Sequence, residues 1–217
     1  MRKVRVGFVG LGWVVQVGHL PGCKHIEVVD VVAGADIRED VLNKVSSRWN
    51  FRGYTDFEEM LRKENLDAVC IATGPTLTRG ITERVAEHGV NVLVEKPMAL
   101  TLEDAKSMVA KCEEEGVKLC YGESMRFLPA CRKAKEMIDD GLLGKLSLLM
   151  ETGVGGRGLE HFESYHIYPP GAPGAGGWGL TDHGIHLVDI FRWLTGDEVE
   201  WVFGRGDRTG QPPATEF

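Results

Sequence analysis

The sequence of 217 residues predicts an α/β fold, with a doubly wound parallel sheet over the first 120 residues and a smaller domain after it. Two observations carry this prediction. Short runs rich in β-branched residues alternate with segments of helical periodicity, which is typical of parallel strands joined by crossover helices. A glycine turn directly follows the first of these runs, at the kind of strand end where such sheets bind ligands.

Five short strands are expected in this first part. They lie at residues 4–9, 27–35, 68–72, 91–94 and 118–121. The clearest helix between them covers 101–116, where apolar residues recur at helical spacing. Thr101 is suited to cap its start, with Asp104 three residues on, and Gly116 marks its end.

The regular alternation of strand and helix patterns ends at about residue 123, so we divide the chain into domains at 1–122 and 123–217. The expected elements of the second domain are a helix at 129–141, a strand at 146–152, a helix at 181–195 and a strand at 198–204. Residues 153–179 form a long glycine- and proline-rich segment of low periodicity, and such loops are often functional. We therefore expect a smaller α+β domain.

Composition excludes several classes of protein. The 25 basic and 32 acidic residues give a formal charge of −7. The sequence therefore lacks the excess of basic residues that is typical of proteins that bind nucleic acid or an anionic membrane. No apolar run approaches the ~18 residues of a membrane span, and no signal-peptide pattern follows Met1. The five cysteines lack CxxC spacing, which favours free thiols in a reducing compartment. We expect a cytoplasmic protein.

The first strand runs into a Gly-Leu-Gly turn that opens a helix. Gly10 and Gly12 permit a tight turn and let the backbone approach a pyrophosphate, while Trp13 and Val14 begin the helix whose free N–H groups would face it. Val15 stands where the dinucleotide-binding fingerprint has glycine or alanine, which we expect to push helix and strand apart. The alternative is a plain tight turn.

Asp36 ends the second strand, near the spacing of about 20 residues from the glycines that a ribose-binding acid requires. A carboxylate here accepts hydrogen bonds from both ribose hydroxyls and repels a 2′-phosphate, so it favours NAD over NADP. Arg38, two residues on, is an alternative partner for that phosphate. The plainer interpretation of Asp36 is a solvated residue at a strand end.

Lys96 lies in the tripeptide Glu95-Lys96-Pro97, directly after the fourth expected strand. Because ligands bind at the carboxyl ends of parallel strands, Lys96 is predicted to be a cation near a substrate hydroxyl or the nicotinamide ribose. The alternative is a surface lysine beside a turn proline.

Asp182 and His186 are four residues apart at the start of the last expected helix, so they share one face. A carboxylate and an imidazole together are suited to general acid–base chemistry near neutral pH. A metal site that adds His161 or His166 is a weaker alternative, because thiolates and a dense ligand cluster are missing; we predict no metal. The plainest alternative is an N-capping Asp182 and a packed histidine.

These motifs occur together in one order along the chain. The segments are Gly10-Leu11-Gly12, Asp36, Ile71-Ala72-Thr73, Glu95-Lys96-Pro97 followed by Met98-Ala99-Leu100-Thr101, Arg126-Phe127, Gly176-Gly177 and Asp182-x-Gly184-x-His186-x-x-Asp189. In this order they resemble the Gfo/Idh/MocA family of nicotinamide-dependent oxidoreductases, over essentially the whole chain.

The resemblance implies an enzyme whose N-terminal Rossmann domain binds NAD or NADP, with Thr73, Glu95 and Lys96 among the cofactor contacts. It implies hydride transfer between the nicotinamide and a hydroxyl or carbonyl of a sugar, polyol or similar small molecule. The cofactor supplies that chemistry, and the protein supplies orientation and proton transfer.

The resemblance also implies roles for individual residues. Lys96 positions the substrate or relays a proton, Asp182 and His186 contact the substrate, and His186 is the acid–base catalyst. Arg126 matches a substrate-binding position near the cleft.

Two departures from the family pattern affect these expectations. Thr76 and Arg79 follow the third expected strand in place of the usual Pro-Asn and later histidine. The family's second domain continues as an open sheet through which members usually dimerise, so we expect a truncated domain and weakened homo-oligomerisation. The alternatives are a nucleotide-binding fragment without turnover and a NAD-sensing protein that binds a partner.

Overall fold

The computed structural model describes residues 2–152 and 183–204. The chain divides into two compact units, Met1–Gly122 and Glu123–Phe217. None of the described helices is long and apolar enough to cross a membrane.

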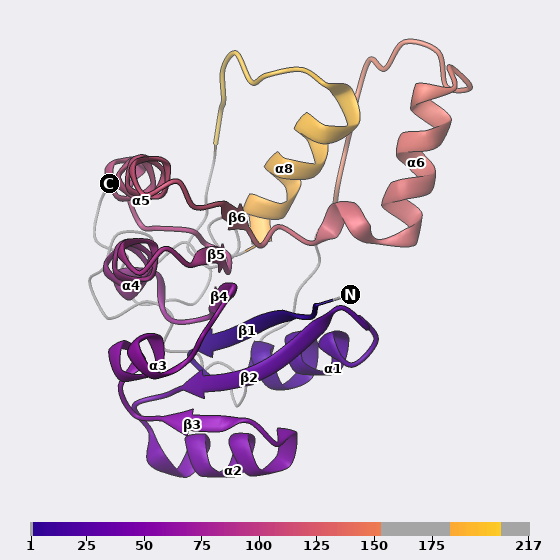
Figure 1. Cartoon of the computed structure of the whole chain (residues 1–217). Helices are drawn as coiled ribbons and strands as arrows, with labels where there is room; N and C mark the ends of the chain where they lie inside the picture. Colours follow the sequence, from indigo (N-terminus) through magenta and orange to yellow (C-terminus); the bar gives the residue numbers. More distant parts are fainter. Residues whose placement is uncertain (1, 153–182, 205–217) are drawn as a thin grey trace, which may run out of the picture. The chain divides into compact units, whose positions relative to one another are not determined.

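The first unit contains a six-stranded sheet in which every neighbouring pair of strands is parallel. The strands are β1 (Val4–Val9), β2 (Val29–Ala35), β3 (Arg52–Tyr54), β4 (Ala68–Ile71), β5 (Asn91–Val94) and β6 (Leu119–Tyr121). Their spatial order is β3-β2-β1-β4-β5-β6, so the direction of winding reverses between β1 and β4 (Figure 1). This is the order of the doubly wound Rossmann sheet, and the reversal marks the crevice where such sheets bind ligands.

Helices connect these strands. They are η1 (Val15–His19), α1 (Leu20–Cys23), α2 (Glu39–Trp49), α3 (Phe57–Lys63), α4 (Pro75–Glu87) and α5 (Leu102–Glu114). The α5 prediction is confirmed in detail, because the Thr101 hydroxyl accepts the Asp104 N–H at 3.1 Å and Gly116 takes a φ of +67° after the helix. The five expected strands are confirmed to within two residues at each end. The short strand β3 was not predicted, because three residues at a sheet edge carry too little periodicity.

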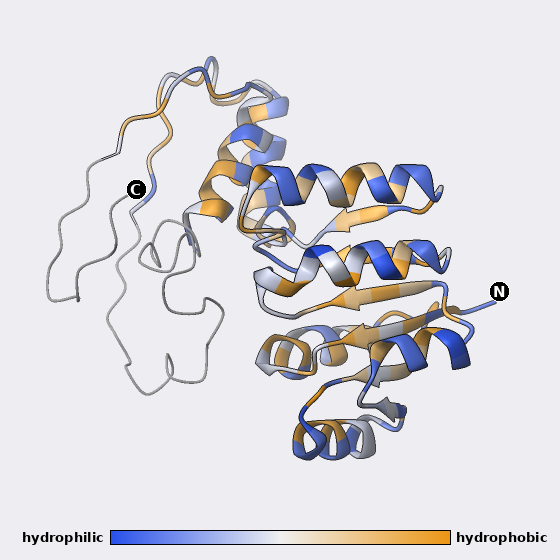
Figure 2. Ribbon diagram, turned by 90° about the vertical axis from the view of Figure 1, so that its left-hand side faces the viewer, coloured by the Kyte–Doolittle hydropathy of each residue, from blue (hydrophilic) through white to orange (hydrophobic). Residues whose placement is uncertain are grey.

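Two apolar cores lie on the two faces of the sheet. Adjacent residues of one strand enter different cores: Val9 belongs to the cluster formed with α3, α4 and α5, and Phe8 to the cluster formed with η1, α1 and α2. This alternation follows from the two-residue period of a strand, and Figure 2 shows the central strands as largely hydrophobic. Val15 is fully buried in the second cluster, so the residue that departs from the glycine fingerprint contributes to the core.

The described part of the second unit is helical. It comprises η2 (Met125–Phe127), α6 (Pro129–Asp139) and α8 (Gly184–Thr195). The helix expected at 129–141 is confirmed, and so is the described part of the one expected at 181–195. The long loop predicted at 153–179 lies outside the described residues.

The strand predictions at 146–152 and 198–204 are wrong, because neither segment forms a strand in the described structure. An apolar run becomes a strand only when a neighbouring backbone pairs with it, and neither segment has such a ladder among the described residues. Their large side chains stay in contact with solvent: Leu148 is 77% exposed and Phe203 is 83% exposed.

Candidate functional site

The glycine turn lies against the end of β4 on one side and is open on the other. Gly10 has a φ of +86°, and a Cβ on it would lie 2.6 Å from the Ala72 carbonyl oxygen. A Cβ on Gly12 would have no described atom within 4 Å. Trp13 is 60% exposed beside it, whereas Val14 is partly buried against the second core. The backbone at Gly12 is therefore accessible to a ligand.

Thr73 follows β4 at the same edge of the sheet. Its Oγ1 atom is buried and has no hydrogen-bond partner among the described residues. An unsatisfied buried hydroxyl costs about 1–3 kcal/mol, so this position favours a group that supplies the missing hydrogen bond. The methyl group of Thr73 borders Gly10, since a Cβ added to Gly10 would lie 3.1 Å from Thr73 Cγ2.

Asp36 directly follows β2 and is 7% exposed, so its carboxylate is buried rather than solvated. Oδ2 accepts the Leu11 N–H of the glycine turn at 2.9 Å, and Oδ1 accepts the backbone N–H of Arg38 at 2.9 Å. Burial alone raises the pKa of Asp36, but the hydrogen bonds from Arg38 and Leu11 outweigh it and hold the pKa below its ordinary value. The carboxylate thus remains ionised at neutral pH and ties the turn to the end of β2.

Arg38 pairs with Asp36 through its side chain as well. Its Nε and Nη2 atoms each donate to the carboxylate at 3.0 Å, and its side chain is 57% exposed. The two residues predicted to bind the adenosine ribose or its phosphate are therefore bound to each other. A carboxylate accepts about four hydrogen bonds, so ribose hydroxyls would have to replace the guanidinium at Asp36.

Glu95 and Lys96 follow β5, and the Lys96–Pro97 peptide bond is cis. Glu95 Oε1 lies 2.7 Å from His19 Nε2 of η1, and Oε2 accepts the Lys96 N–H at 3.0 Å. Burial raises the pKa of Glu95, but His19 and the Lys96 N–H outweigh it and lower the pKa below its ordinary value. Glu95 thus links the lysine-bearing segment to the helix after the glycine turn. Sequence reasoning missed His19.

Arg79 forms its hydrogen bonds with residues of the helices α4 and α5. Its guanidinium binds Glu83 and Asp104, each at 2.9 Å. The neighbouring Thr78 is buried, with its hydroxyl 2.8 Å from the Met98 carbonyl oxygen. The segment that departs from the family pattern therefore braces α4 against α5 and the loop after β5.

In the second unit, His186 of α8 is bound to Glu123. Its Nδ1 atom lies 2.7 Å from both carboxylate oxygens of Glu123. The two side chains are 14% and 3% exposed, respectively. Asp182, the predicted partner of His186, lies outside the described residues, as do His161 and His166. Sequence reasoning missed Glu123, although it stands two residues after β6, at the kind of strand end that drew attention to Lys96.

Arg126 is paired with Asp189 of α8. Its Nε donates to Asp189 Oδ2 at 2.7 Å, and its Nη2 donates to Oδ1. This pairing raises the pKa of Arg126 above its ordinary value. The guanidinium predicted to contact substrate thus holds the η2 segment against α8.

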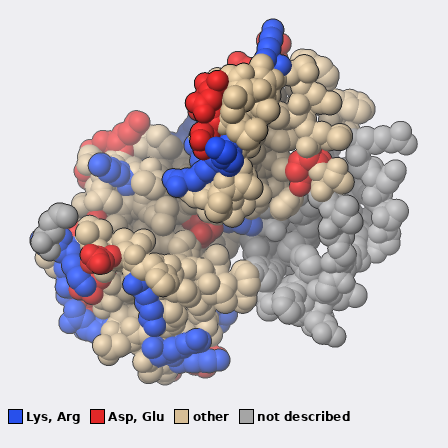
Figure 3. All heavy atoms as spheres, turned by 90° about the vertical axis from the view of Figure 1, so that its right-hand side faces the viewer, with Lys and Arg blue, Asp and Glu red and all other residues tan. Residues whose placement is uncertain are grey.

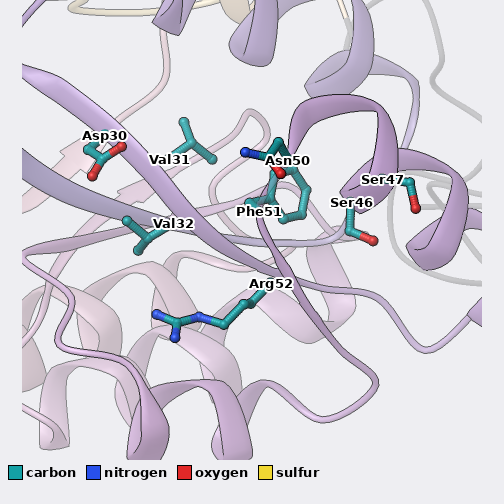
Figure 4. A pocket seen from close by; sticks show the side chains of 8 residues that line it. All are labelled: Asp30, Val31, Val32, Ser46, Ser47, Asn50, Phe51 and Arg52. Carbon is teal, nitrogen blue, oxygen red and sulfur yellow. The ribbon is translucent and has the colours of Figure 1, made fainter.

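A hollow of about 560 Å³ lies at the opposite ends of β2 and β3 (Figure 4). It is lined by Asp30, Val31, Val32, Ser46, Ser47, Asn50, Phe51 and Arg52. None of the predicted site residues contributes to it. It is therefore separate from the candidate site at the glycine turn.

Comparison with known proteins agrees with this arrangement. Residues 4–123 match the model of the Gfo/Idh/MocA oxidoreductase family with an NAD-binding Rossmann fold, and residues 131–216 match a C-terminal domain of that family. The chain belongs to the Gfo/Idh/MocA family.

Three similar proteins illustrate the relatives that this chain matches. It is 33% identical over 200 residues to D-apiose dehydrogenase of Paraburkholderia graminis, covering 91% of this chain and 51% of that protein. It is 34% identical over 216 residues to 2,7-anhydro-N-acetylneuraminate hydratase of Mediterraneibacter gnavus, covering 93% and 52%. The crystal structure of the WlbA dehydrogenase from Bordetella pertussis in complex with NADH and UDP-GlcNAcA matches with a TM-score of 0.74 and 26% identity, covering 89% and 58%. The chain spans about half the length of these relatives.

Proposed function

We propose that this chain acts in a NAD-dependent oxidoreductase that transfers hydride between the nicotinamide and a hydroxyl or carbonyl carbon of a sugar or polyol. One observation carries the proposal: the open backbone at Gly12, the unsatisfied Thr73 hydroxyl and the buried carboxylate of Asp36 lie at the ends of β1, β4 and β2. These three ends are adjacent, because β1 lies between the other two strands. The names of similar proteins support the substrate class.

The residues of the first unit fit a dinucleotide. The open backbone at Gly12 would face a pyrophosphate, with Trp13 and Val14 beginning the helix behind it. The Gly10 N–H is already bound to the Ala35 carbonyl oxygen at 2.8 Å, so Gly10 contributes the shape of the turn. Thr73 supplies a hydroxyl, and Asp36 supplies a carboxylate for the ribose. When bound, NAD accepts or donates the hydride, and the chain supplies orientation and proton transfer.

The proton of the substrate hydroxyl passes to His186 when the substrate is oxidised. Nδ1 of His186 is bound to Glu123, so Nε2 is the atom that takes the proton. Lys96 binds the substrate oxygen as a cation, and Glu95 holds the segment that carries it. Asp182 remains a proposed substrate contact. We assign Arg126 to holding α8 through Asp189 instead of to substrate binding.

NAD is the proposed cofactor, with NADP as the alternative. The ionised carboxylate of Asp36 repels a 2′-phosphate, whereas the half-exposed guanidinium of Arg38 attracts one. We expect fluorescence titration of the chain to give tighter binding of NADH than of NADPH, and Arg38→Ala to leave NADH binding in place. Tighter binding of NADPH that is lost in Arg38→Ala would assign NADP instead.

Turnover is tested with a panel of sugars and polyols in the presence of NAD. We expect Lys96→Ala and His186→Gln to lower kcat by about 10²–10⁴-fold, the usual contribution of general acid–base groups, without changing the Kd of NADH. A panel on which the chain binds NADH but oxidises no substrate would favour a NAD-binding protein without turnover. Unchanged activity in both variants would show that the residue roles are wrong.

Location and assembly are proposals as well. All five cysteines are free, with Cys70 and Cys112 buried and Cys120 exposed, which supports a reducing compartment such as the cytoplasm. Acidic and basic side chains are interspersed on the face that Figure 3 shows, which supports a small molecule over nucleic acid as the partner. The exposed apolar residues of 146–150 and 199–203 support assembly with a second copy.

A further inference from the structure

We propose that Glu123 is the positioning residue of His186: it holds the imidazole with the proton on Nδ1, so that Nε2 carries the lone pair. The catalytic consequence of this arrangement rests on the proposed function above. The protonation pattern itself can be measured without substrate or cofactor.

The contact between the two side chains defines which nitrogen is the donor. A carboxylate only accepts hydrogen bonds, and both of its oxygens lie 2.7 Å from Nδ1 of His186. Nδ1 must therefore carry a proton. A neutral imidazole has one such proton, so Nε2 is left as the base.

Glu123 is itself held in place. The Met125 N–H of η2 donates to its Oε1 at 3.1 Å, and its side chain is only 3% exposed. A buried carboxylate without partners would be strongly unfavourable, so the pairing with His186 and the backbone is needed for Glu123 to remain there.

A second pair braces the same two segments. Arg126 binds Asp189. Arg126 lies three positions after Glu123, and Asp189 lies three positions after His186. Donor and acceptor are exchanged between the two pairs, since the segment at η2 supplies the carboxylate Glu123 to the first pair and the guanidinium Arg126 to the second. His186 and Asp189 share a face of α8 because residues three apart are neighbours on a helix. Two contacts on one face resist rotation of α8.

His183 is a second side chain in contact with the ring of His186. Its ring centroid lies 5.7 Å from that of His186, with the ring planes at 74°. This is an edge contact and supplies no acceptor to Nδ1. His183 instead has Glu151 3.8 Å from its Nε2. The geometry therefore identifies Glu123 as the residue that determines which nitrogen of His186 carries the proton.

The test is a two-bond ¹H–¹⁵N correlation spectrum of the full chain labelled with ¹⁵N-histidine, at a pH where the ring signals are those of neutral imidazole. His186→Gln identifies the signals. We expect the Nδ1–H form in the unmodified chain and in Glu123→Gln, because the amide oxygen still accepts this hydrogen bond. In Glu123→Ala we expect the Nε2–H form to appear. Glu151→Gln is the matched control and should change nothing at His186.

An Nε2–H form of His186 in the unmodified chain would overturn the proposal, and this measurement needs no variant to fold. An unchanged tautomer in a folded Glu123→Ala chain would overturn it as well. Where turnover is found, Glu123→Ala should lower kcat by about 10²-fold, with the KM for substrate and the Kd of NADH unchanged and with recovery in Glu123→Gln. Failure to bind NADH with the Nδ1–H form intact would count against the proposed function alone.

Discussion

Gly10 is required for two separate reasons, which a pair of variants can distinguish. Its φ of +86° lies in the left-handed region, and a Cβ would meet the backbone of Ala72 at 2.6 Å. Gly89 also has a positive φ, of +70°, but no described atom within 4 Å of its Cβ position. The comparison therefore separates backbone strain from a steric clash.

We predict that Gly89→Ala lowers the free energy of unfolding by about 1 kcal/mol, the usual cost of a left-handed residue with a side chain. Gly10→Ala should cost about 1–3 kcal/mol more, because the turn must also move away from β4. Urea denaturation of the two variants measures the difference. Equal losses would mean that the turn moves away from Ala72 without cost.

Asp36 makes stability depend on pH in a defined direction. Its pKa in the folded chain is below the value of about 3.9 expected in the unfolded chain, because Arg38 and Leu11 bind the ionised form. The stabilisation is therefore complete well above pH 4 and is lost as the pH falls through the folded pKa.

We predict that Asp36→Asn lowers the free energy of unfolding by about 1.5–3 kcal/mol at neutral pH, the range for a hydrogen bond to a charged group. The difference from the unmodified chain should shrink as the pH falls below about 4. Denaturation curves at several pH values measure it, with Asp30→Asn, an exposed position of the same strand, as the control. A difference that does not vary with pH would contradict the role of the ionised carboxylate.

At the scale of elements, the contact between His19 and Glu95 joins η1 to the end of β5. The two side chains are 23% and 15% exposed, so the hydrogen bond is partly shielded from water. It connects the helix after the glycine turn with the segment that contains Lys96, although the two are far apart in sequence.

We predict that His19→Ala lowers the free energy of unfolding by about 1.5–3 kcal/mol, because the Glu95 carboxylate loses a donor while partly buried. His19→Gln should recover part of this loss, since its side-chain amide can donate to the same oxygen. Chemical denaturation measures both variants. His25→Ala is a matched control in the same region, at an exposed position. Equal stability of His19→Ala and the unmodified chain would show that the contact contributes nothing.

At the scale of the whole molecule, the two segments that were expected to be strands expose a large apolar surface. Trp201 is 79% exposed, Val202 85% and Phe203 83%, so three consecutive large apolar side chains are in contact with solvent. Contiguous apolar surface of this kind promotes association.

We predict that Trp201→Lys combined with Phe203→Lys reduces self-association of the chain without lowering its stability, because neither side chain is buried. Light scattering across a range of protein concentrations measures the first effect, and thermal unfolding measures the second. Lys133→Ala on α6, whose side chain is 63% exposed, is a polar surface control. A double variant that associates as strongly as the unmodified chain would place the association surface elsewhere.

The fold of the first unit was predictable because its signals are local. Strand periodicity, the Thr101 cap and the glycine turn each depend on a few consecutive residues, and the right-handed crossover rule then gives the parallel sheet. The short strand β3 was not predictable in this way, since it is defined by its pairing with β2 and not by its own three residues.

The candidate site was predictable in part. The glycines, Asp36, Lys96 and His186 could be named from their positions at strand ends and on one helix face. Their partners could not, because the pairs Glu123–His186 and Arg126–Asp189 each join residues 63 positions apart. A carboxylate two residues after β6 was a usable signal for Glu123, but nothing local indicated which histidine it would bind.

Five of the six strands of the first unit, the glycine turn and the family of this chain follow from its amino-acid order alone. The reason is that backbone propensities and turn geometry act over a few residues. The pairing of Asp36 with Arg38, the histidine partners of Glu95 and Glu123, and the absence of strands at 146–152 and 198–204 in the described structure emerge only from the folded chain. These features depend on which distant groups are brought within hydrogen-bonding distance, and a buried charge is stable only where such a partner is present.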